Sequence, residues 1–270
     1  MNYDLAEISD PPRGKSEVLL PTIEESLRAR RAYLATLRRM LVALVGAVGS
    51  EVLPQVEEEK RRMADSAEFL DALSASLWER IRALAVSLAA TASRTVDSIL
   101  SLESQRHTDQ FVEAARKTLG IDLRAVVRQE DLTDLLAAVS IRNAELIKDL
   151  SQETVAKIAR TVSDSVLSGQ GARELRGEIK EVMETSDSRA ELIATDQTAK
   201  LNSDLNRARQ EQAGVDKYVW RTSQDERVRP RHRRLDGHVY EWGEPTGAES
   251  GLPPGKPIRC RCVAQGVVEF

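Results

Sequence analysis

Apolar residues recur at helical spacing through most of the chain. Between residues 22 and 53 they stand three, four or seven apart, at Leu27, Leu34, Leu37, Leu41, Leu44 and Val48. From Leu70 to Leu102 the same spacing continues for about nine turns. A stripe of this period is buried when long helices pack side by side. The spacing therefore predicts a mainly α protein whose long helices form an elongated helical bundle.

Capping and turn residues divide the helical part into segments. Thr22-Ile23-Glu24-Glu25 has the form of a capping box that begins the first helix, and Pro54 closes or kinks that helix. Ser66 is expected to cap the long second helix, which Gly120 ends. After a short helix or loop at 122–130, further helices are expected at 132–150, at 152–167 with Ser151 as its cap, at 172–185, and from a second capping box at Ser188 to Gln212.

The character of the sequence changes after Gly214. Prolines, glycines and aromatic residues become frequent, and residues 217–222 and 237–242 alternate like short strands. Trp220, Tyr240 and Trp242 are expected to form the core of this small part. We predict four regions: an extended N-terminal arm (1–21), a long helical arm (22–130), a second helical part (131–213), and a small α+β C-terminal module of short strands and loops (214–270).

Cysteine content and hydropathy point to the cytoplasm. The two cysteines stand one residue apart, which excludes a disulfide framework. The N-terminus is acidic and lacks the apolar segment of a signal peptide. The most apolar run, Met40 to Val48, is far shorter than the roughly 20 residues that cross a bilayer. A chain kept in a reducing cytoplasm, or in a particle assembled there, is expected.

Arginines cluster in the C-terminal module. Residues 217–262 carry ten Lys/Arg and six Asp/Glu, whereas the whole chain has a net charge of -4. We expect nucleic-acid or partner contacts from Arg227, Arg231, Arg233 and Arg234, because guanidinium groups suit phosphate and carboxylate. The alternative is internal pairing with Asp225, Glu226 and Asp236, and Arg229 is assigned to a structural pair.

Cysteines and histidines of the module form a candidate metal set. His232, His238, Cys260 and Cys262 supply enough ligands for a tetrahedral zinc, although their spacing matches no common zinc motif. The alternative is that both cysteines are small buried hydrophobic residues and that His232 bonds a carboxylate such as Asp225 or Asp236. A third interpretation takes Asp225, His232, Asp236 and His238 as the centre of a metal-dependent nuclease acting on DNA.

Spaced motifs identify a resemblance. The segments RAELIATDQTAKLN (189–202), GVDKYVWRTSQDERVRPRH (214–232), LDGHVYEW (235–242) and PPGKPIRCRC (253–262) resemble the phage head morphogenesis family, the phage Mu protein F-like minor head proteins. The resemblance covers roughly residues 140–265. It implies that Trp220, Asp225, Arg229, Asp236 and Gly237 are structural residues. Another branch of the family has C-x-x-C where this chain has Arg229 and His232, and a histidine in place of Pro257.

The resemblance also implies a function. It indicates a structural minor capsid protein of a tailed bacteriophage, without enzymatic activity, that associates with the portal vertex and the capsid interior during head assembly. The implied partners are the portal protein, a major capsid or scaffolding protein, and packaged double-stranded DNA, with no membrane at assembly. The implied location is the virion, assembled in the cytoplasm of the bacterial host.

Overall fold

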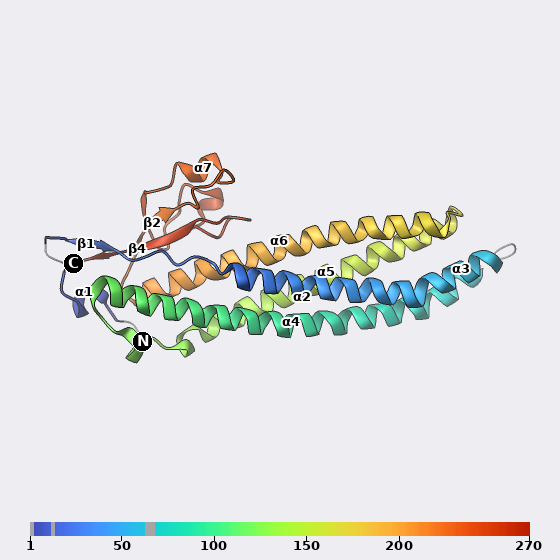
Figure 1. The fold of residues 1–270 in the computed structure, drawn as a ribbon, viewed down its shortest axis with the longest axis horizontal. Coiled ribbons are helices and arrows are strands. Elements are labelled where there is room, and N and C mark those ends of the chain that lie inside the picture. Colours follow the sequence, from blue (N-terminus) through green and yellow to red (C-terminus); the bar gives the residue numbers. More distant parts are fainter. Residues whose placement is uncertain (1–2, 12–13, 63–67) are drawn as a thin grey trace. The chain divides into compact units, whose positions relative to one another are not determined.

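A computed structural model describes residues 3–11, 14–62 and 68–270 of the chain (Figure 1). The chain divides into two compact units. The mixed unit comprises Met1–Arg30, Ser98–Val139 and Thr195–Phe270, and the helical unit comprises Arg31–Asp97 and Ser140–Ala194. Long helices and one small antiparallel sheet make up the regular structure, which confirms the predicted class of a mainly α protein with a small α+β module.

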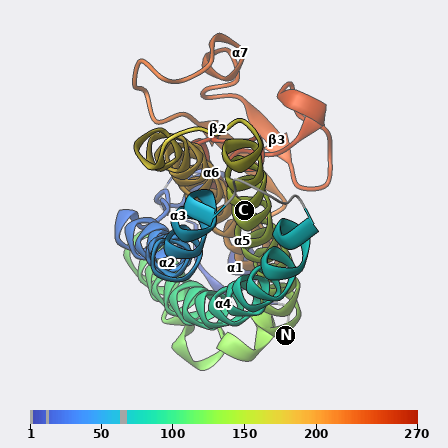
Figure 2. The same cartoon turned by 90° about the vertical axis from the view of Figure 1, so that its right-hand side faces the viewer.

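The helical unit is built from segments of five helices. These are α2 (Leu27–Ala47), α3 (Leu53–Arg62), α4 (Glu68–Leu119), α5 (Thr133–Leu167) and α6 (Ala172–Gln212). Figure 2 looks along them and shows α2, α4, α5 and α6 around a shared interior. The interior is almost wholly aliphatic and includes Leu44, Val48, Ile81, Ala85, Val155, Ile158 and Leu175. The heptad spacing of α2 therefore follows its buried face.

A wide helical turn joins α2 to α3. Residues Val48–Val52 form a π-helical turn, η1, in which the Leu53 N–H donates to the Val48 carbonyl. Pro54 follows at once, where its ring and missing N–H disfavour a regular α-helical turn. The sequence predicts that Pro54 closes or kinks the first helix, and the structure shows that the α-helix is interrupted there while the chain remains helical.

Three predicted helix starts differ from the structure. The first helix is capped by Ser26, whose Oγ accepts from the Ala29 N–H at 3.2 Å, and not by the box at Thr22. Ser151 lies inside α5 and donates to the Ala85 carbonyl. Ser188 lies inside α6 and donates to the Glu184 carbonyl one turn back. A serine hydroxyl that bonds an internal carbonyl is compatible with a helix interior, so neither serine starts a new helix.

Other predicted boundaries agree with the structure. Gly120 and Gly214 follow α4 and α6 with φ of 73° and 69°, a left-handed conformation that ends helices. Ser66 lies outside the described residues. The linker after α4 contains two short 3-10 turns, η2 (Leu123–Ala125) and η3 (Gln129–Leu132).

The sheet of the mixed unit has the strand order β1-β4-β2-β3, with antiparallel pairing throughout. Its strands are β1 (Glu17–Leu19), β2 (Lys217–Arg221), β3 (Val239–Glu241) and β4 (Val263–Glu269). β2 and β3 match the two predicted strands. β1 comes from the segment predicted to be an extended arm, and that segment also carries a short helix, α1 (Leu5–Ile8). Leu5 and Val18 are buried, so the arm belongs to the core of the unit.

The N-terminal helical region also meets a simple test for membrane spans. Residues Leu27–Glu58 are long and apolar enough to cross a bilayer, judged by length and composition alone, with 39% of the most apolar window buried. The shorter apolar run Met40–Val48 predicts no crossing of a bilayer. In the structure, Tyr33, Leu37, Leu41, Leu44 and Val48 of this region are buried within the helical unit. One such helix is weak evidence for a membrane span.

Candidate functional site

The candidate site lies in the C-terminal module, where a short helix faces a loop. Helix α7 (Pro230–Arg233) begins with a proline, which favours the first helical position because it needs no N–H partner there. The helix turns His232 inward, and His232 is 2% exposed. A turn closed by the Cys260 N–H and the Pro257 carbonyl presents Cys260, and Cys262 immediately precedes β4.

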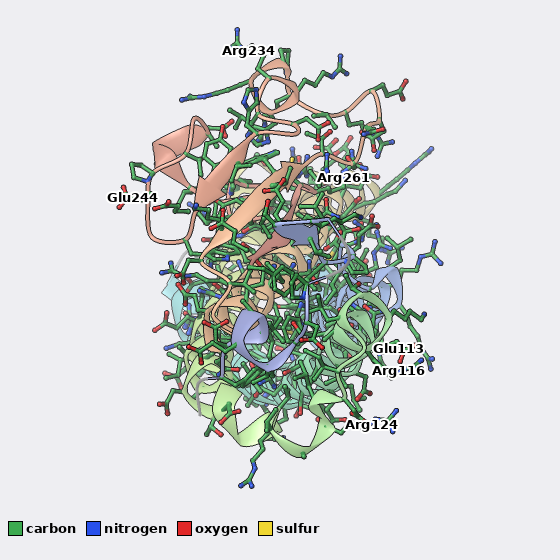
Figure 3. All side chains as sticks on the ribbon, turned by 90° about the vertical axis from the view of Figure 1, so that its left-hand side faces the viewer. Glu113, Arg116, Arg124, Arg234, Glu244 and Arg261 are labelled. Carbon is green, nitrogen blue, oxygen red and sulfur yellow. The ribbon has the colours of Figure 1, made fainter. Side chains whose placement is uncertain are left out.

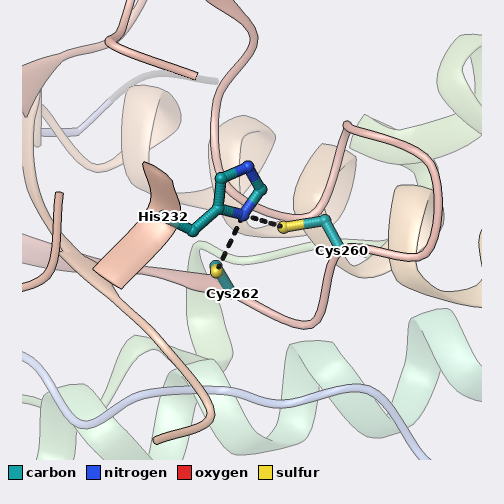
Figure 4. A group of neighbouring side chains, drawn as sticks. All are labelled: His232, Cys260 and Cys262. Carbon is teal, nitrogen blue, oxygen red and sulfur yellow. Dashed lines mark hydrogen bonds between the residues drawn. The ribbon is translucent and has the colours of Figure 1, made fainter. Parts of the chain in front are cut away.

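Three potential metal ligands meet at this point (Figure 4). His232 Nδ1 lies 3.5 Å from Cys260 Sγ and 3.6 Å from Cys262 Sγ. One ligand atom from each residue lies within 4.8 Å of the others. Cys260 and Cys262 are 3% and 5% exposed. The arrangement places two sulfurs and an imidazole nitrogen around one buried point.

A carboxylate holds the other side of the imidazole. His232 Nε2 lies 2.6 Å from Oε2 of Glu249, at the start of the 3-10 turn η4 (Glu249–Gly251). Arg229 Nη1 lies 3.3 Å from Oε1 of the same carboxylate. The hydrogen bond with His232, aided by the charge of Arg229, lowers the pKa of Glu249 below its ordinary value. Glu249 is therefore charged at neutral pH and fixes the orientation of the ring.

Apolar and aromatic groups surround the cluster. Trp220, Leu235 and Ala248 are buried beside the two cysteines. The Trp220 and His232 rings meet edge to face with centroids 5.3 Å apart. A hydrogen bond with Cys262 lowers the pKa of the Cys260 thiol to about 6, and Cys260 in turn raises the pKa of Cys262.

The structure does not bring His238 to this cluster. The backbone of His238 pairs with that of Trp220, and its side chain is exposed. Asp225 pairs with Arg261, with Oδ1 2.7 Å from Nη2, and Arg261 lowers the pKa of Asp225. Asp236 accepts from the Thr222 N–H at 2.7 Å. Among the described residues, the four side chains proposed for a nuclease centre therefore do not form one ligand group.

The remaining predicted structural residues lie in the sheet and its turns. Gly237 has φ of 79° and donates its N–H to the Trp220 carbonyl, so this turn favours glycine. Trp242 stacks on Tyr218 with centroids 4.2 Å apart. Its indole N–H donates to Gln210 of α6, and Gln210 in turn donates to the Ala264 carbonyl of β4. These contacts fasten the sheet to α6 within the mixed unit.

The predicted contact arginines lie on the surface of the module. Arg227 and Arg234 are exposed, and Figure 3 shows Arg234 extending away from the ribbon. Arg231 donates to the Gly247 carbonyl, and Arg233 donates to the Glu226 carbonyl at 3.1 Å. Backbone carbonyls orient these two side chains without neutralising their charge.

Sequence reasoning missed two residues that organise the site. Glu249 is one of two glutamates in a Gly/Pro-rich loop, and nothing in its spacing relates it to His232. Gly255 has φ of 85°, and a Cβ there would stand 3.0 Å from Ser203 Cβ of α6. Its N–H donates to Cys260 Sγ at 3.4 Å. The glycine of the proline-rich PPGKP segment was the available signal for a close approach of backbone to a helix.

Polar contacts hold this loop on α6. Asp196 accepts from the Arg259 N–H at 3.3 Å and pairs with Lys200 at 2.6 Å. Ser203 donates to the Pro254 carbonyl at 2.6 Å. The Ile-Ala-Thr-Asp segment of α6 is thereby linked to the loop that carries Cys260.

The fold and site define a helical protein with a compact Cys/His-containing C-terminal module. Residues 156–265 match the family described as Phage Mu protein F like protein. The family resemblance predicted from the motifs at 189–262 is confirmed. The match includes the last third of α5, all of α6 and the module as far as Gln265 in β4.

A relative from Haemophilus influenzae extends the similarity. It is a protein described as uncharacterized, 34% identical over 168 residues, which are 62% of this chain. The chain spans 37% of the length of that relative. No solved structure matches the chain.

Proposed function

We propose that this chain is a structural minor capsid protein that acts in head assembly of a tailed bacteriophage. The observation that carries the proposal is the family match over residues 156–265, which supports a role in phage head morphogenesis. The buried site agrees with a structural role, because His232, Cys260 and Cys262 are each at most 5% exposed and so offer little access to a substrate.

The proposed partners divide between the two parts of the chain. We assign the helices to docking on the portal vertex and on a major capsid or scaffolding protein. The module, with Arg227, Arg231, Arg233 and Arg234 on its surface, is assigned to packaged DNA. Arginine forks suit phosphate oxygens, and a contact of this kind is independent of base sequence.

Composition of the assembled head tests the assembly role. An epitope-tagged chain is expressed during phage growth, and purified heads are analysed by mass spectrometry and by reconstruction without imposed symmetry. We expect the chain in heads at low copy number, with density at the portal vertex. Heads that form normally without the gene and never contain the chain would refute the proposal.

DNA binding is tested separately with matched arginine variants. We expect Arg227→Ala and Arg234→Ala together to weaken binding to double-stranded DNA. The slope of log K against log salt should fall by about one for each phosphate that the variant no longer binds. Arg124→Ala is the control, because Arg124 is also exposed but lies in the η2 turn. Equal effects of the two sets would exclude a specific role for the module.

A metal-dependent nuclease remains the second candidate from the sequence. The dispersed positions of Asp225, Asp236 and His238 do not support it. Purified protein is incubated with DNA and Mg²⁺, Mn²⁺ or Zn²⁺, alongside His232→Ala. Cleavage by the wild type that is abolished in His232→Ala would overturn the structural assignment.

A further inference from the structure

We propose that His232, Cys260 and Cys262 bind one zinc ion, with Glu249 as the carboxylate that orients the histidine. The site would act as a structural staple that joins α7, the PPGKP loop and the start of β4. The proposal concerns the described side chains of the module and does not depend on the assembly role.

The distances between the ligand atoms carry the argument. A tetrahedral zinc with Zn–S bonds of about 2.3 Å and Zn–N bonds of about 2.0 Å places sulfur and nitrogen about 3.6 Å apart. The observed separations from His232 Nδ1 are 3.5 Å to Cys260 Sγ and 3.6 Å to Cys262 Sγ. Both nitrogen–sulfur separations are therefore those expected for ligands of one ion, and the two sulfurs lie within 4.8 Å of each other.

Hydrogen bonding alone accounts poorly for the same arrangement. Both sulfurs face Nδ1 of His232, as Figure 4 shows, and Nδ1 has a single direction for a hydrogen bond. One sulfur is therefore left without a hydrogen bond to Nδ1, although Cys260 Sγ also accepts from the Gly255 N–H and is hydrogen-bonded to Cys262. A cation between the three atoms accepts both sulfurs and the nitrogen lone pair at once.

Hydrogen bonds from neighbouring residues orient the three ligand side chains, as such bonds do in known metal sites. Glu249 lies 2.6 Å from His232 Nε2, which leaves Nδ1 to face the sulfurs. Such a carboxylate fixes the ring and raises the basicity of the ligating nitrogen. On the sulfur side, the Gly255 N–H donates to Cys260 Sγ, and Ser203 holds the neighbouring Pro254 carbonyl.

The ligand types select the metal and its role. Two thiolates and an imidazole suit Zn²⁺, whereas Mg²⁺ and Ca²⁺ require oxygen ligands. Three protein ligands leave the fourth position for water or a donor from outside the trio. The apolar cluster around the three ligand residues is small and consists of Trp220, Leu235 and Ala248 besides the two cysteines. A module with so small a core gains stability from a metal staple.

Metal content and spectroscopy of the full chain test the proposal. We expect about one zinc per chain by elemental analysis, and thiolate-to-metal charge-transfer absorption after exchange with Co²⁺. Cys262→Ser should abolish that absorption. Glu249→Gln should weaken zinc affinity by about 10–100-fold, measured by chelator competition. His238→Gln is the matched control, because His238 lies outside the trio and should leave affinity unchanged.

If the cysteine variants fail to fold, measurements on the wild-type protein still test the proposal. Chelation should release zinc, expose two titratable thiols and lower the melting temperature. Folded wild type that takes up neither Zn²⁺ nor Co²⁺ would overturn the proposal, whether Cys260 and Cys262 are then free thiols or oxidised. Equal loss of zinc affinity in His238→Gln and Glu249→Gln would overturn the ligand set.

Discussion

The two units of this protein bury different kinds of side chain. Among the residues whose burial the structure describes, the buried polar residues of the helical unit are small hydroxyls and one amide: Thr36, Asn143, Ser151, Thr154, Ser165 and Ser186. Those of the mixed unit include large and ionisable groups: Glu103, His107, Asp196, Asn202, Asn206, Arg209 and His232. Because α4 and α6 each run through both units, the kind of polar side chain that one helix buries changes along its length.

This difference indicates in which unit the stability depends on specific pairs of side chains. Apolar burial is non-directional, so the helical unit can repack around a changed side chain. A buried polar group requires one specific partner, as His107 Nε2 requires Asn206 Oδ1 at 3.1 Å. We therefore expect broad tolerance in the helical unit and position-specific sensitivity in the mixed unit.

The largest effect is expected at Trp220 of the mixed unit. Trp220 is 0% exposed and packs against His232. Trp220→Ala should lower the free energy of unfolding by about 3–5 kcal/mol, measured by urea denaturation. Val239→Ala on the exposed face of β3 is the control and should change it by less than about 0.5 kcal/mol. A decrease at Trp220 no greater than the control's would show that the module adds little to stability.

A buried aliphatic position in the helical unit gives the next test. Ile158 is 0% exposed in that core. Ile158→Ala should cost about 2–5 kcal/mol, whereas Ile158→Val should cost only about 0.5–1.5 kcal/mol. Hydrogen exchange should show reduced protection in α5 near Ile158, while the β2–β4 amides remain protected. An equal reduction in the sheet would show that the two units unfold as one and would break the comparison.

Acid should destabilise the mixed unit through His107. Burial lowers the pKa of His107 to about 3, against about 6.5 when unfolded. The unfolded state therefore binds the proton first, and stability contributed by neutral His107 is lost as pH falls below 6.5. The expected slope approaches about 1.4 kcal/mol per pH unit between those values.

His107→Gln isolates this effect because glutamine can still bond Asn206 but does not titrate. Denaturant titrations at pH 7, 6 and 5 should show a shallower decline for the variant than for the wild type. Parallel curves for the two proteins would show that His107 is protonated in the folded state as easily as in the unfolded one.

The smallest effect is expected at the surface pair of Asp225 and Arg261. Their side chains are 37% and 29% exposed. Asp225→Asn should lower the free energy of unfolding only slightly at low salt and less at high salt. Since its pKa is lowered in the folded state, the contribution of Asp225 is lost as pH falls through its folded pKa, below 3.8. A double-mutant cycle with Arg261→Gln measures the pair, and a coupling as large as the effect of Trp220→Ala would contradict this assignment.

Local patterns predicted the helices and two of the strands. The heptad spacing of Leu27 to Val48, the left-handed glycines and the alternation at 217–222 each depend on neighbours in sequence. The predictions that Ser151 and Ser188 start helices were wrong. A serine before acidic residues has the same sequence pattern whether its hydroxyl caps a helix or bonds a carbonyl inside one. The cysteines and His232 were selected by residue type, but only the fold separates His232 from His238 and supplies Glu249.

Pairing of β1 with β4 constrains how the protein is made. Val18 lies opposite Val268, so almost the whole chain is enclosed between the two strands. During synthesis the helices have most of their partners long before β4 leaves the ribosome. Loop closure over such a length is slow compared with helix formation. We expect Val18 to stay solvent-accessible on the nascent chain until the sheet closes, which makes the β1 segment a natural site for chaperone binding.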